Sequence, residues 1–234
     1  MTTLYQPDNG YHYNSDTIFL YDFVSKLNLK GYILDLGSGS GILGILLAKN
    51  FSKIVLESIE KQEIFHKLTE KNSEINRVSN KNYHLDFLES NFQNRYDFIV
   101  SNPPFYSSNV VQTKNSNLNI ARYNTHLPID QFFEKVSKAL KSRGYFIFCY
   151  DAKQFQDLAI ALKKYRLQIE RVRFVHSSLA KNASLVMVQT RKNSKSDITF
   201  NSPLINFSDE VKDIYIKTDT YSLTANLDGL LDTL

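Results

Sequence analysis

Three glycines that follow a short apolar segment are the first residues whose spacing could serve chemistry. Residues 32–36 are followed by Gly37, Gly39 and Gly41. Glycine lets the chain turn tightly and lets its backbone approach a ligand closely, and a helix that begins there offers free N–H groups. The pattern indicates a cofactor loop. Gly39-x-Gly41-x-x-Gly44 alone also fits a dinucleotide site or a plain tight turn.

Three acidic residues lie at or just after the ends of the first three predicted strands. Asp35 lies two residues before the first glycine, where a carboxylate repels a pyrophosphate but suits a cationic amine such as the methionine end of S-adenosylmethionine. Glu60 follows Gly41 by about 20 residues, the spacing of an acid that accepts ribose hydroxyls. Asp86 is placed to meet an adenine amino group. As an alternative, Glu60 or Asp86 could cap a helix.

The segment Ser-Asn-Pro-Pro-Phe-Tyr at 101–106 follows the fourth predicted strand. Its prolines fix the backbone and remove N–H donors, which leaves carbonyls and the Asn102 oxygen at the edge where open α/β sheets bind ligands. Two acceptors can hold both hydrogens of a conjugated amino group and favour a pyramidal nitrogen. Phe105 can stack on the planar group, a contact worth roughly 1–3 kcal/mol on a base. The segment therefore predicts methyl transfer to a planar amino nitrogen by Asn102, Pro103, Pro104 and Phe105, the alternative being a Pro-Pro turn beside a core Phe.

Strands and helices alternate along the chain. Predicted strands cover 32–36, 53–59, 82–85, 96–101, 145–150, 169–175 and 184–190, and predicted helices cover 16–27, 42–49, 62–77, 128–143 and 154–165. This order predicts a doubly wound parallel sheet that ends in an antiparallel hairpin. Residues 1–15 read as turn-rich and 191–234 show no clear period. We expect an N-terminal cap segment at 1–30, a core at 31–190 and an extension packed on the core at 191–234.

The composition is that of an ordinary globular protein. The 234 residues carry 28 basic and 24 acidic side chains, and 42% are hydrophobic, which excludes wholesale disorder and fibrous repeats. Because Cys149 is the single cysteine, an intramolecular disulfide is excluded, which fits a reducing compartment. We expect Cys149 to pack in the core, within a buried strand. Residues 1–9 do not resemble a signal peptide and the apolar runs are too short to span a bilayer. We expect a cytoplasmic protein without membrane contact.

Basic residues are concentrated between 160 and 195, where Glu170 is the single acid. The basic residues of this stretch are Lys163, Lys164, Arg166, Arg171, Arg173, Lys181, Arg191, Lys192 and Lys195. Such an excess fits a surface for RNA phosphates or a solvated face. The five histidines are scattered without the spacing of metal ligands, so we expect no metal site.

The order of these features resembles the class I S-adenosylmethionine-dependent methyltransferases that act on amino groups, over about residues 10–190. Within them the chain is similar to the bacterial tRNA1(Val) (adenine-N6)-methyltransferase family. Three segments carry this resemblance: Asn-Ser-Asp-Thr at 14–17, the segment at 101–106, and Ala-Arg-Tyr-Asn-Thr at 121–125.

The resemblance implies an α/β, Rossmann-like class I methyltransferase fold, with a seven-stranded, mostly parallel sheet, helices on both faces and a final antiparallel strand. It implies S-adenosylmethionine as cofactor and N6-methylation of the adenosine 3′ of the anticodon of valine tRNA. The implied cofactor residues are Asp16, Thr17, Asp35, Gly37, Gly39, Gly41, Glu60, Asp86 and Phe87. The expected RNA-binding residues are Tyr106, Lys114, Arg122, Tyr123, Lys163, Lys164 and Arg166.

Other functions remain open at this stage. Phe105 is also typical of guanine-N2 methyltransferases of ribosomal RNA, which often carry a following His where Tyr106 stands here. Glutamine methyltransferases of release factors share such a core but carry a large helical domain before it, and DNA adenine methyltransferases carry a target-recognition domain. An oxidoreductase would not explain the segment at 101–106. An idle RNA-binding module would not need Asp35, Glu60 and Asn102. Oligomeric state is left open.

Overall fold

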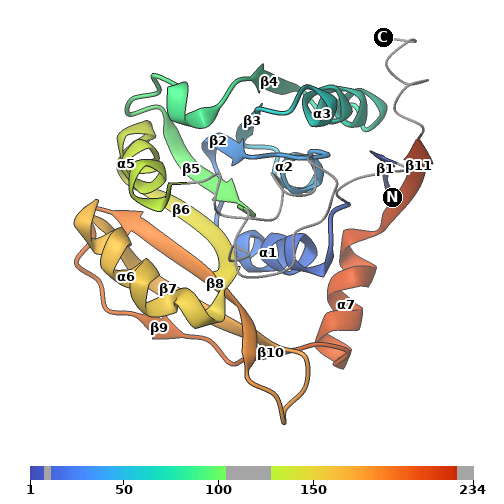
Figure 1. Cartoon of the computed structure of the whole chain (residues 1–234). Coiled ribbons are helices and arrows are strands. Elements are labelled where there is room, and N and C mark those ends of the chain that lie inside the picture. The colour runs from blue at the N-terminus through green and yellow to red at the C-terminus, as the bar shows by residue number, and fades with distance from the viewer. Residues whose placement is uncertain (8–11, 104–127, 226–234) are drawn as a thin grey trace.

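A central twisted sheet organises the computed structural model, which describes residues 1–7, 12–103 and 128–225 (Figure 1). Its strands lie in the order β10-β7-β8-β6-β5-β2-β3-β4, and β9 also pairs with β7. The seven longer strands are β2 (Gly31–Leu36), β3 (Ile54–Glu60), β4 (Asn80–His84), β5 (Tyr96–Ser101), β6 (Leu140–Asp151), β7 (Leu167–His176) and β8 (Ala183–Lys192). β8 runs antiparallel to β6 and β7, and the other long strands are parallel.

This sheet confirms the predicted class, a mostly parallel sheet with a final antiparallel strand. Two strands of two residues each, β9 (Thr199–Phe200) and β10 (Leu204–Ile205), extend it beyond the seven that were predicted. They come from the segment for which the sequence shows no clear period. Strands this short carry too few residues for an alternating pattern to be recognised.

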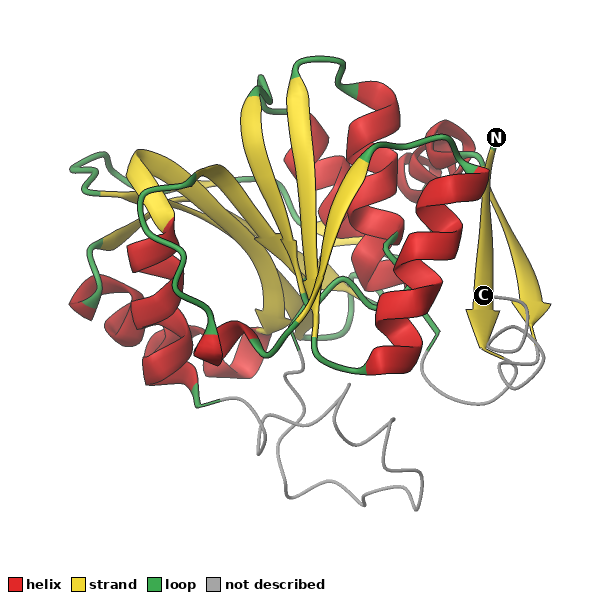
Figure 2. Ribbon diagram, turned by 90° about the horizontal axis from the view of Figure 1, so that it is seen from above, coloured by secondary structure: helices red, strands yellow, loops and turns green. Residues whose placement is uncertain are grey.

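Helices cover both faces of the sheet (Figure 2). The helices are α1 (Ser15–Ser25), α2 (Ile42–Asn50), α3 (Glu63–Ile75), α5 (Ile129–Ala139), α6 (Phe155–Lys164) and α7 (Asp209–Thr218), with short turns η1 (Phe87–Glu89) and η3 (Ala152–Gln154). α2 packs between α1 and α3, and α5 packs beside α6. Because α2 is apolar on all sides, it is buried almost completely. In the described parts of the chain, every helix is too short or too polar to cross a membrane.

The junction between α5 and β6 differs from the predicted helix over 128–143. α5 ends at Ala139 and β6 begins at Leu140. Tyr96 lies opposite Leu140 and Phe98 lies opposite Tyr145, so the intervening residues of β6 form a bulge. A Cβ at Gly144 would lie 3.0 Å from the carbonyl oxygen of Lys141. Gly144 therefore permits a close backbone approach within the strand instead of ending a helix.

A separate two-stranded parallel ribbon joins the two ends of the described chain. β1 (Thr2–Pro7) pairs with β11 (Thr220–Ala225) beside α3 (Figure 1). The prediction of a turn-rich segment is therefore wrong for residues 2–7. This pairing joins residues more than 200 positions apart, and no local pattern reports a partner that distant.

The described C-terminal residues pack on the core. Val211 and Ile214 of α7 and Leu204 of β10 belong to the main hydrophobic cluster. Arg173 of β7 donates to Glu210 Oε2 at 2.7 Å and to the Ser202 carbonyl at 3.0 Å. The Arg173 side chain is buried, whereas the Glu210 side chain is about half exposed, so the ion pair lies at the edge of the core.

Candidate active site

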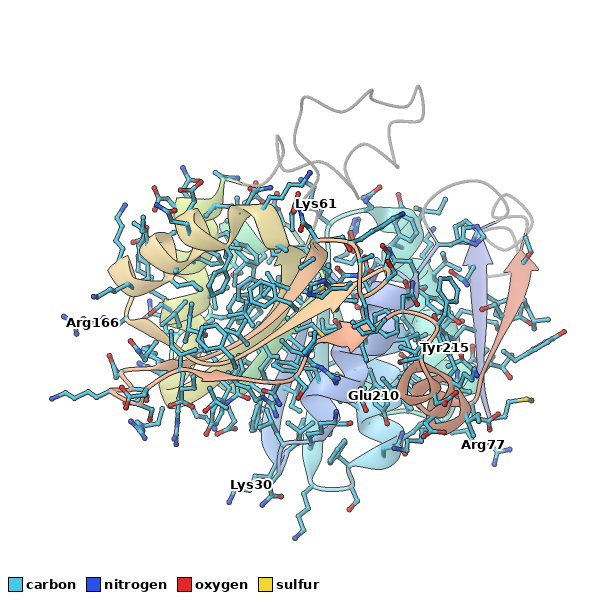
Figure 3. All side chains as sticks on the ribbon, turned by 90° about the horizontal axis from the view of Figure 1, so that it is seen from below. Lys30, Lys61, Arg77, Arg166, Glu210 and Tyr215 are labelled. Carbon is cyan, nitrogen blue, oxygen red and sulfur yellow. The ribbon has the colours of Figure 1, made fainter. Side chains whose placement is uncertain are left out.

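The predicted ligand-binding residues follow parallel strands at one edge of the sheet. Asp35 lies near the end of β2, Glu60 ends β3 and Asn102 follows β5. Asp35 lies level with Ser58 of β3 and Val100 of β5. In Figure 3, Lys61, which follows β3, marks this carboxyl edge, and Lys30, which precedes β2, marks the opposite, amino edge. The structure thus brings the strand ends together at the carboxyl edge, as the parallel order requires.

The glycine loop combines open space with close packing. Gly37, Gly39 and Gly41 have φ angles of +70°, +56° and +81°, in the left-handed region that favours glycine. A Cβ at Gly37 or Gly39 would meet no atom within 4 Å, whereas a Cβ at Gly41 would lie 3.0 Å from Thr69 Cγ2. The first two glycines therefore face space that a ligand can occupy, and the third is required by its contact with α3.

Two buried polar residues of α3 hold the loop in this conformation. Thr69 donates through Oγ1 to the Gly39 carbonyl at 2.8 Å. Asn72 donates through Nδ2 to the Ser40 carbonyl at 2.8 Å and also accepts from the Tyr5 N–H at 2.7 Å. Neither residue was predicted from the sequence. Their polarity on the buried side of an amphipathic helix, three residues apart, is the pattern that could have indicated them.

Asp35 is a buried carboxylate that faces the loop. It is 2% exposed, and its Oδ2 accepts from the Gly44 N–H at 2.9 Å. Burial raises the pKa of Asp35 to about 7; the Gly44 hydrogen bond opposes this rise and the nearby Glu60 adds to it. Within the described residues no basic side chain pairs with Asp35. A ligand cation would supply the missing charge.

Glu60 and Asp86 both bond to backbone N–H groups. Glu60 accepts from Gly39 at 3.1 Å and from Gln62 at 2.9 Å, and its burial raises its pKa. Asp86 accepts from Leu88 at 2.9 Å, which caps η1. The structure thus shows the capping alternative for Asp86. The carboxylate oxygens of Glu60 and Asp86 each have a second lone pair that a ligand could use.

Phe87 presents its side chain to the core. Its ring is 6% exposed and meets Phe132 edge-on at 6.0 Å between centroids. Only its backbone can contribute to a cofactor site in this arrangement.

The Asn102 amide is fixed from two sides. Its Nδ2 donates to Thr17 Oγ1 at 2.9 Å, and its Oδ1 accepts from the Cys149 thiol at 2.9 Å. Burial raises the pKa of Cys149 well above its ordinary value, so the thiol keeps its proton and remains a donor. Since a thiol is a weak acceptor, this contact favours the orientation that places Oδ1 toward Cys149.

The start of α1 positions Thr17 for this contact. Asn14 caps the helix by accepting from the Asp16 N–H at 3.1 Å, and burial raises the pKa of Asp16. The Thr17 hydroxyl bonds to Asn102, and the expected contact of Thr17 with the cofactor stays a prediction. Cys149 was expected to serve packing alone. A cysteine inside an apolar strand gives no pattern that separates these two roles.

Comparison with known proteins identifies the family. Residues 14–175 match the methyltransferase small domain. The chain belongs to this family. It is 30% identical over 173 residues to the tRNA1(Val) (adenine(37)-N6)-methyltransferase of Flavobacterium psychrophilum, covering 71% of this chain and 74% of that protein. It is 28% identical over 169 residues to the protein of the same name from Pedobacter heparinus, covering 70% of each chain.

A relative with another acceptor also matches. The release factor glutamine methyltransferase of Fusobacterium nucleatum is 31% identical over 145 residues, 56% of this chain and 40% of that protein. Among solved structures, a predicted O-methyltransferase from Agrobacterium tumefaciens superposes with a TM-score of 0.68 at 16% identity, covering 89% of this chain and 99% of that one. A class I methyltransferase from Listeria monocytogenes gives a TM-score of 0.61 at 17% identity, covering 87% and 68%. These likenesses show the class I methyltransferase fold.

This methyltransferase uses S-adenosylmethionine, and the residues at the carboxyl edge fit that cofactor. The space beside Gly37 and Gly39 would receive it, and the buried Asp35 carboxylate suits its ammonium group. A dinucleotide would instead place a pyrophosphate beside two buried acids, Asp35 and Glu60.

The basic stretch of the methyltransferase does not lie at this site. β7 is parallel to the strands that carry the site, so Lys163, Lys164 and Arg166, which precede it, lie at the opposite, amino edge. The prediction that these three residues bind RNA stays a prediction, and any such contact would lie away from Asn102. Arg171 donates to the Phe23 carbonyl at 2.7 Å and Arg173 is buried, so part of the predicted charge excess points inward.

Several predicted residues lie outside the described part of the chain. These are Pro104, Phe105, Tyr106, Lys114, Arg122 and Tyr123. Their roles stay predictions.

Two histidines that are 18 positions apart in the sequence, His66 and His84, stack with 5.1 Å between their ring centroids. Among the described residues, no group of three potential metal ligands is present.

Proposed function

We propose that the methyltransferase methylates N6 of an adenine in tRNA, at the adenosine 3′ of the anticodon of valine tRNA, in the cytoplasm. The observation that carries the proposal is the fixed amide of Asn102 at the carboxyl edge, one strand away from the buried carboxylate of Asp35. The relatives from Flavobacterium psychrophilum and Pedobacter heparinus, whose names give this reaction, support it.

The cofactor side of the site would be formed by the ends of β2, β3 and β4. Asp35 would hold the methionine ammonium, Glu60 the ribose hydroxyls, and Asp86 with the Phe87 backbone the adenine. Bound S-adenosylmethionine supplies an activated methyl group. The protein contributes position and charge.

On the acceptor side, Asn102 Oδ1 has a second lone pair beside the one that accepts from Cys149. This lone pair and the Pro103 carbonyl would accept the two hydrogens of the adenine amino group, and Phe105 would stack on the ring. These contacts improve as the nitrogen becomes pyramidal, so they act mainly on the transition state. The base must leave its stack at a cost of a few kcal/mol, which is least for a base already unpaired, as in an anticodon loop.

Glutamine methylation of a release factor is the second candidate. The 31% identity to the Fusobacterium nucleatum enzyme favours it, and a carboxamide nitrogen is also planar and conjugated. Asn102 could hold its two hydrogens in the same way. The guanine-N2 alternative rests on Phe105 alone.

Product analysis distinguishes these acceptors. Purified protein and labelled S-adenosylmethionine are incubated with total tRNA and ribosomal RNA from a strain that lacks the gene, and in parallel with release factors. We expect N6-methyladenosine in tRNA by nucleoside mass spectrometry, formed much more slowly by Asn102→Ala. N2-methylguanosine in ribosomal RNA or methylglutamine in a release factor, with unmodified tRNA, would contradict the proposal.

A further inference from the structure

A basic cavity lies at the amino edge of the sheet, away from the methyl-transfer site. Its volume is about 300 Å³, and it is lined by Lys163, Arg166, Gln168, Asn193, Ser194 and Lys195. Three of these six residues are cationic, and the other three are neutral and polar. The lining therefore has a net charge of +3 and suits an anion.

The cations of this cavity are available for a ligand. Lys163, Arg166 and Lys195 are exposed, and none forms an ion pair within the described residues. The neighbouring Lys164 differs, because its Nζ lies 3.1 Å from Asp130 Oδ1. The acid beside the cavity, Glu170, accepts from the Ser194 hydroxyl at 2.5 Å.

Two turns that hold each other form the wall of the cavity. Arg166 has a φ of +59° and donates its N–H to the Lys163 carbonyl at 3.1 Å. Its own carbonyl accepts from the Asn193 N–H at 2.9 Å, and Gln168 Nε2 donates to the Ser196 carbonyl at 3.1 Å. These bonds fix the backbone from which the cationic side chains extend, so less conformational entropy is lost when an anion binds.

The distance from the methyl-transfer site limits the ligand. Ser101, next to Asn102, lies level with Val172 of β7 across β6 and β8, five residues after β7 begins beside the cavity. At about 3.3 Å per residue along the strands and about 4.8 Å per strand across them, the cavity and Asn102 are roughly 25 Å apart. A single loop nucleotide held at Asn102 cannot reach both places. A folded RNA can, because its backbone carries phosphates along its whole length.

We propose that this cavity binds backbone phosphates of the tRNA stem while the target base lies at the carboxyl edge. The inference rests on the proposed function and adds a second, remote contact to it. Arg166 can form a bidentate pair with a phosphate, and Lys163 and Lys195 add point charges. The cavity would therefore recognise substrate length and charge, not base sequence.

The test compares two RNA substrates that share one loop. One is whole valine tRNA, and the other is a hairpin whose stem has about three base pairs, roughly 10 Å long. We expect the combined variant Lys163→Gln, Arg166→Gln and Lys195→Gln to bind whole tRNA about 10-fold or more weakly at low salt. The slope of log affinity against log salt should fall by about one for each phosphate that the variant no longer neutralises. Binding of the short hairpin should be unchanged.

Arg77→Gln is the matched control. Arg77 is also an exposed arginine with a left-handed backbone, φ +54°, and its N–H donates to the Glu74 carbonyl as that of Arg166 does to Lys163. Figure 3 shows Arg77 and Arg166 on opposite sides of the molecule. An Arg166→Gln effect no larger than that of Arg77→Gln, or an equal weakening for both RNAs, would overturn the remote site. Wild-type protein that neither binds nor methylates tRNA would instead overturn the proposed function.

Discussion

At the scale of single residues, the site depends on groups whose protonation is set by burial. Asp35 has a pKa of about 7 in the folded protein against an ordinary 3.8. Folding therefore favours the neutral acid. The contribution of Asp35 to the free energy of unfolding is fully present below pH 3.8 and is lost as pH rises through 7. Between these values the free energy of unfolding falls by about 1.4 kcal/mol per pH unit. The ionised form that a cofactor ammonium needs is the form that weakens the fold.

Asp35→Asn tests this conflict between stability and binding. Asn can still accept from Gly44 but carries no charge. In urea unfolding without cofactor, the variant should gain more stability over wild type at pH 8 than at pH 5. Calorimetry should show S-adenosylmethionine binding about 10- to 100-fold weaker, the change expected for a hydrogen bond to a charged group. A gain independent of pH, or unchanged affinity in a folded variant, would contradict the assignment.

Cys149 is expected to position Asn102. Cys149→Ala removes the donor to Oδ1 and should slow single-turnover transfer by about 2- to 10-fold, the worth of one neutral hydrogen bond. The apparent affinities for cofactor and RNA should stay the same. Cys149→Ser retains a donor and should restore the rate. A serine variant as slow as the alanine variant would show that the cysteine serves packing alone.

At the scale of elements, α3 links the terminal ribbon to the glycine loop. Asn72 bonds to Tyr5 of β1 and to Ser40 of the loop. Asn76 bonds instead to Thr3 of β1 and, within α3, to the Asn72 carbonyl. Asn72 therefore supports both the ribbon and the glycine loop, whereas Asn76 supports the ribbon and, among the described residues, makes no bond to the loop.

Asn72→Ala and Asn76→Ala form a matched comparison. Each change should destabilise the protein by about 1–3 kcal/mol, because backbone groups of β1 lose their partners. Only Asn72→Ala should also weaken S-adenosylmethionine binding, because it frees the Ser40 carbonyl. Equal cofactor affinities for the two variants in calorimetry would show that α3 does not support the loop.

The sequence predicted elements with a local pattern and missed those without one. The sheet was predicted from the apolar runs of β2, β3, β5 and β6. Its ligand-binding edge was predicted from the glycines that follow β2. β1 and β11 depend on a partner at the other end of the chain, and α7 buries only one narrow face. Cys149, Thr69 and Asn72 act through three-dimensional contacts that spacing along one strand or helix does not reveal.

At the scale of the whole molecule, the C-terminal segment belongs to the folded unit. Arg173→Met removes the partner of Glu210 and the donor to Ser202. Because water can solvate the half-exposed Glu210, the main loss is the hydrogen bonds of Arg173, and the free energy of unfolding should fall by about 1–2 kcal/mol. Thermal unfolding should show one transition at a lower temperature. Two separate transitions would mean that the segment around α7 unfolds independently of the sheet.

The most direct test of the account is single-turnover methyl transfer to valine tRNA by Asn102→Ala, at saturating cofactor and RNA. The variant removes one of the two preorganised acceptors and should slow transfer by about 100-fold or more, because the hydrogen bond to Asn102 improves as the nitrogen becomes pyramidal. The dissociation constants for S-adenosylmethionine and tRNA should stay near those of wild type. Transfer of the methyl group to adenine N6 at the wild-type rate would contradict the central claim that Asn102 holds the reacting amino group.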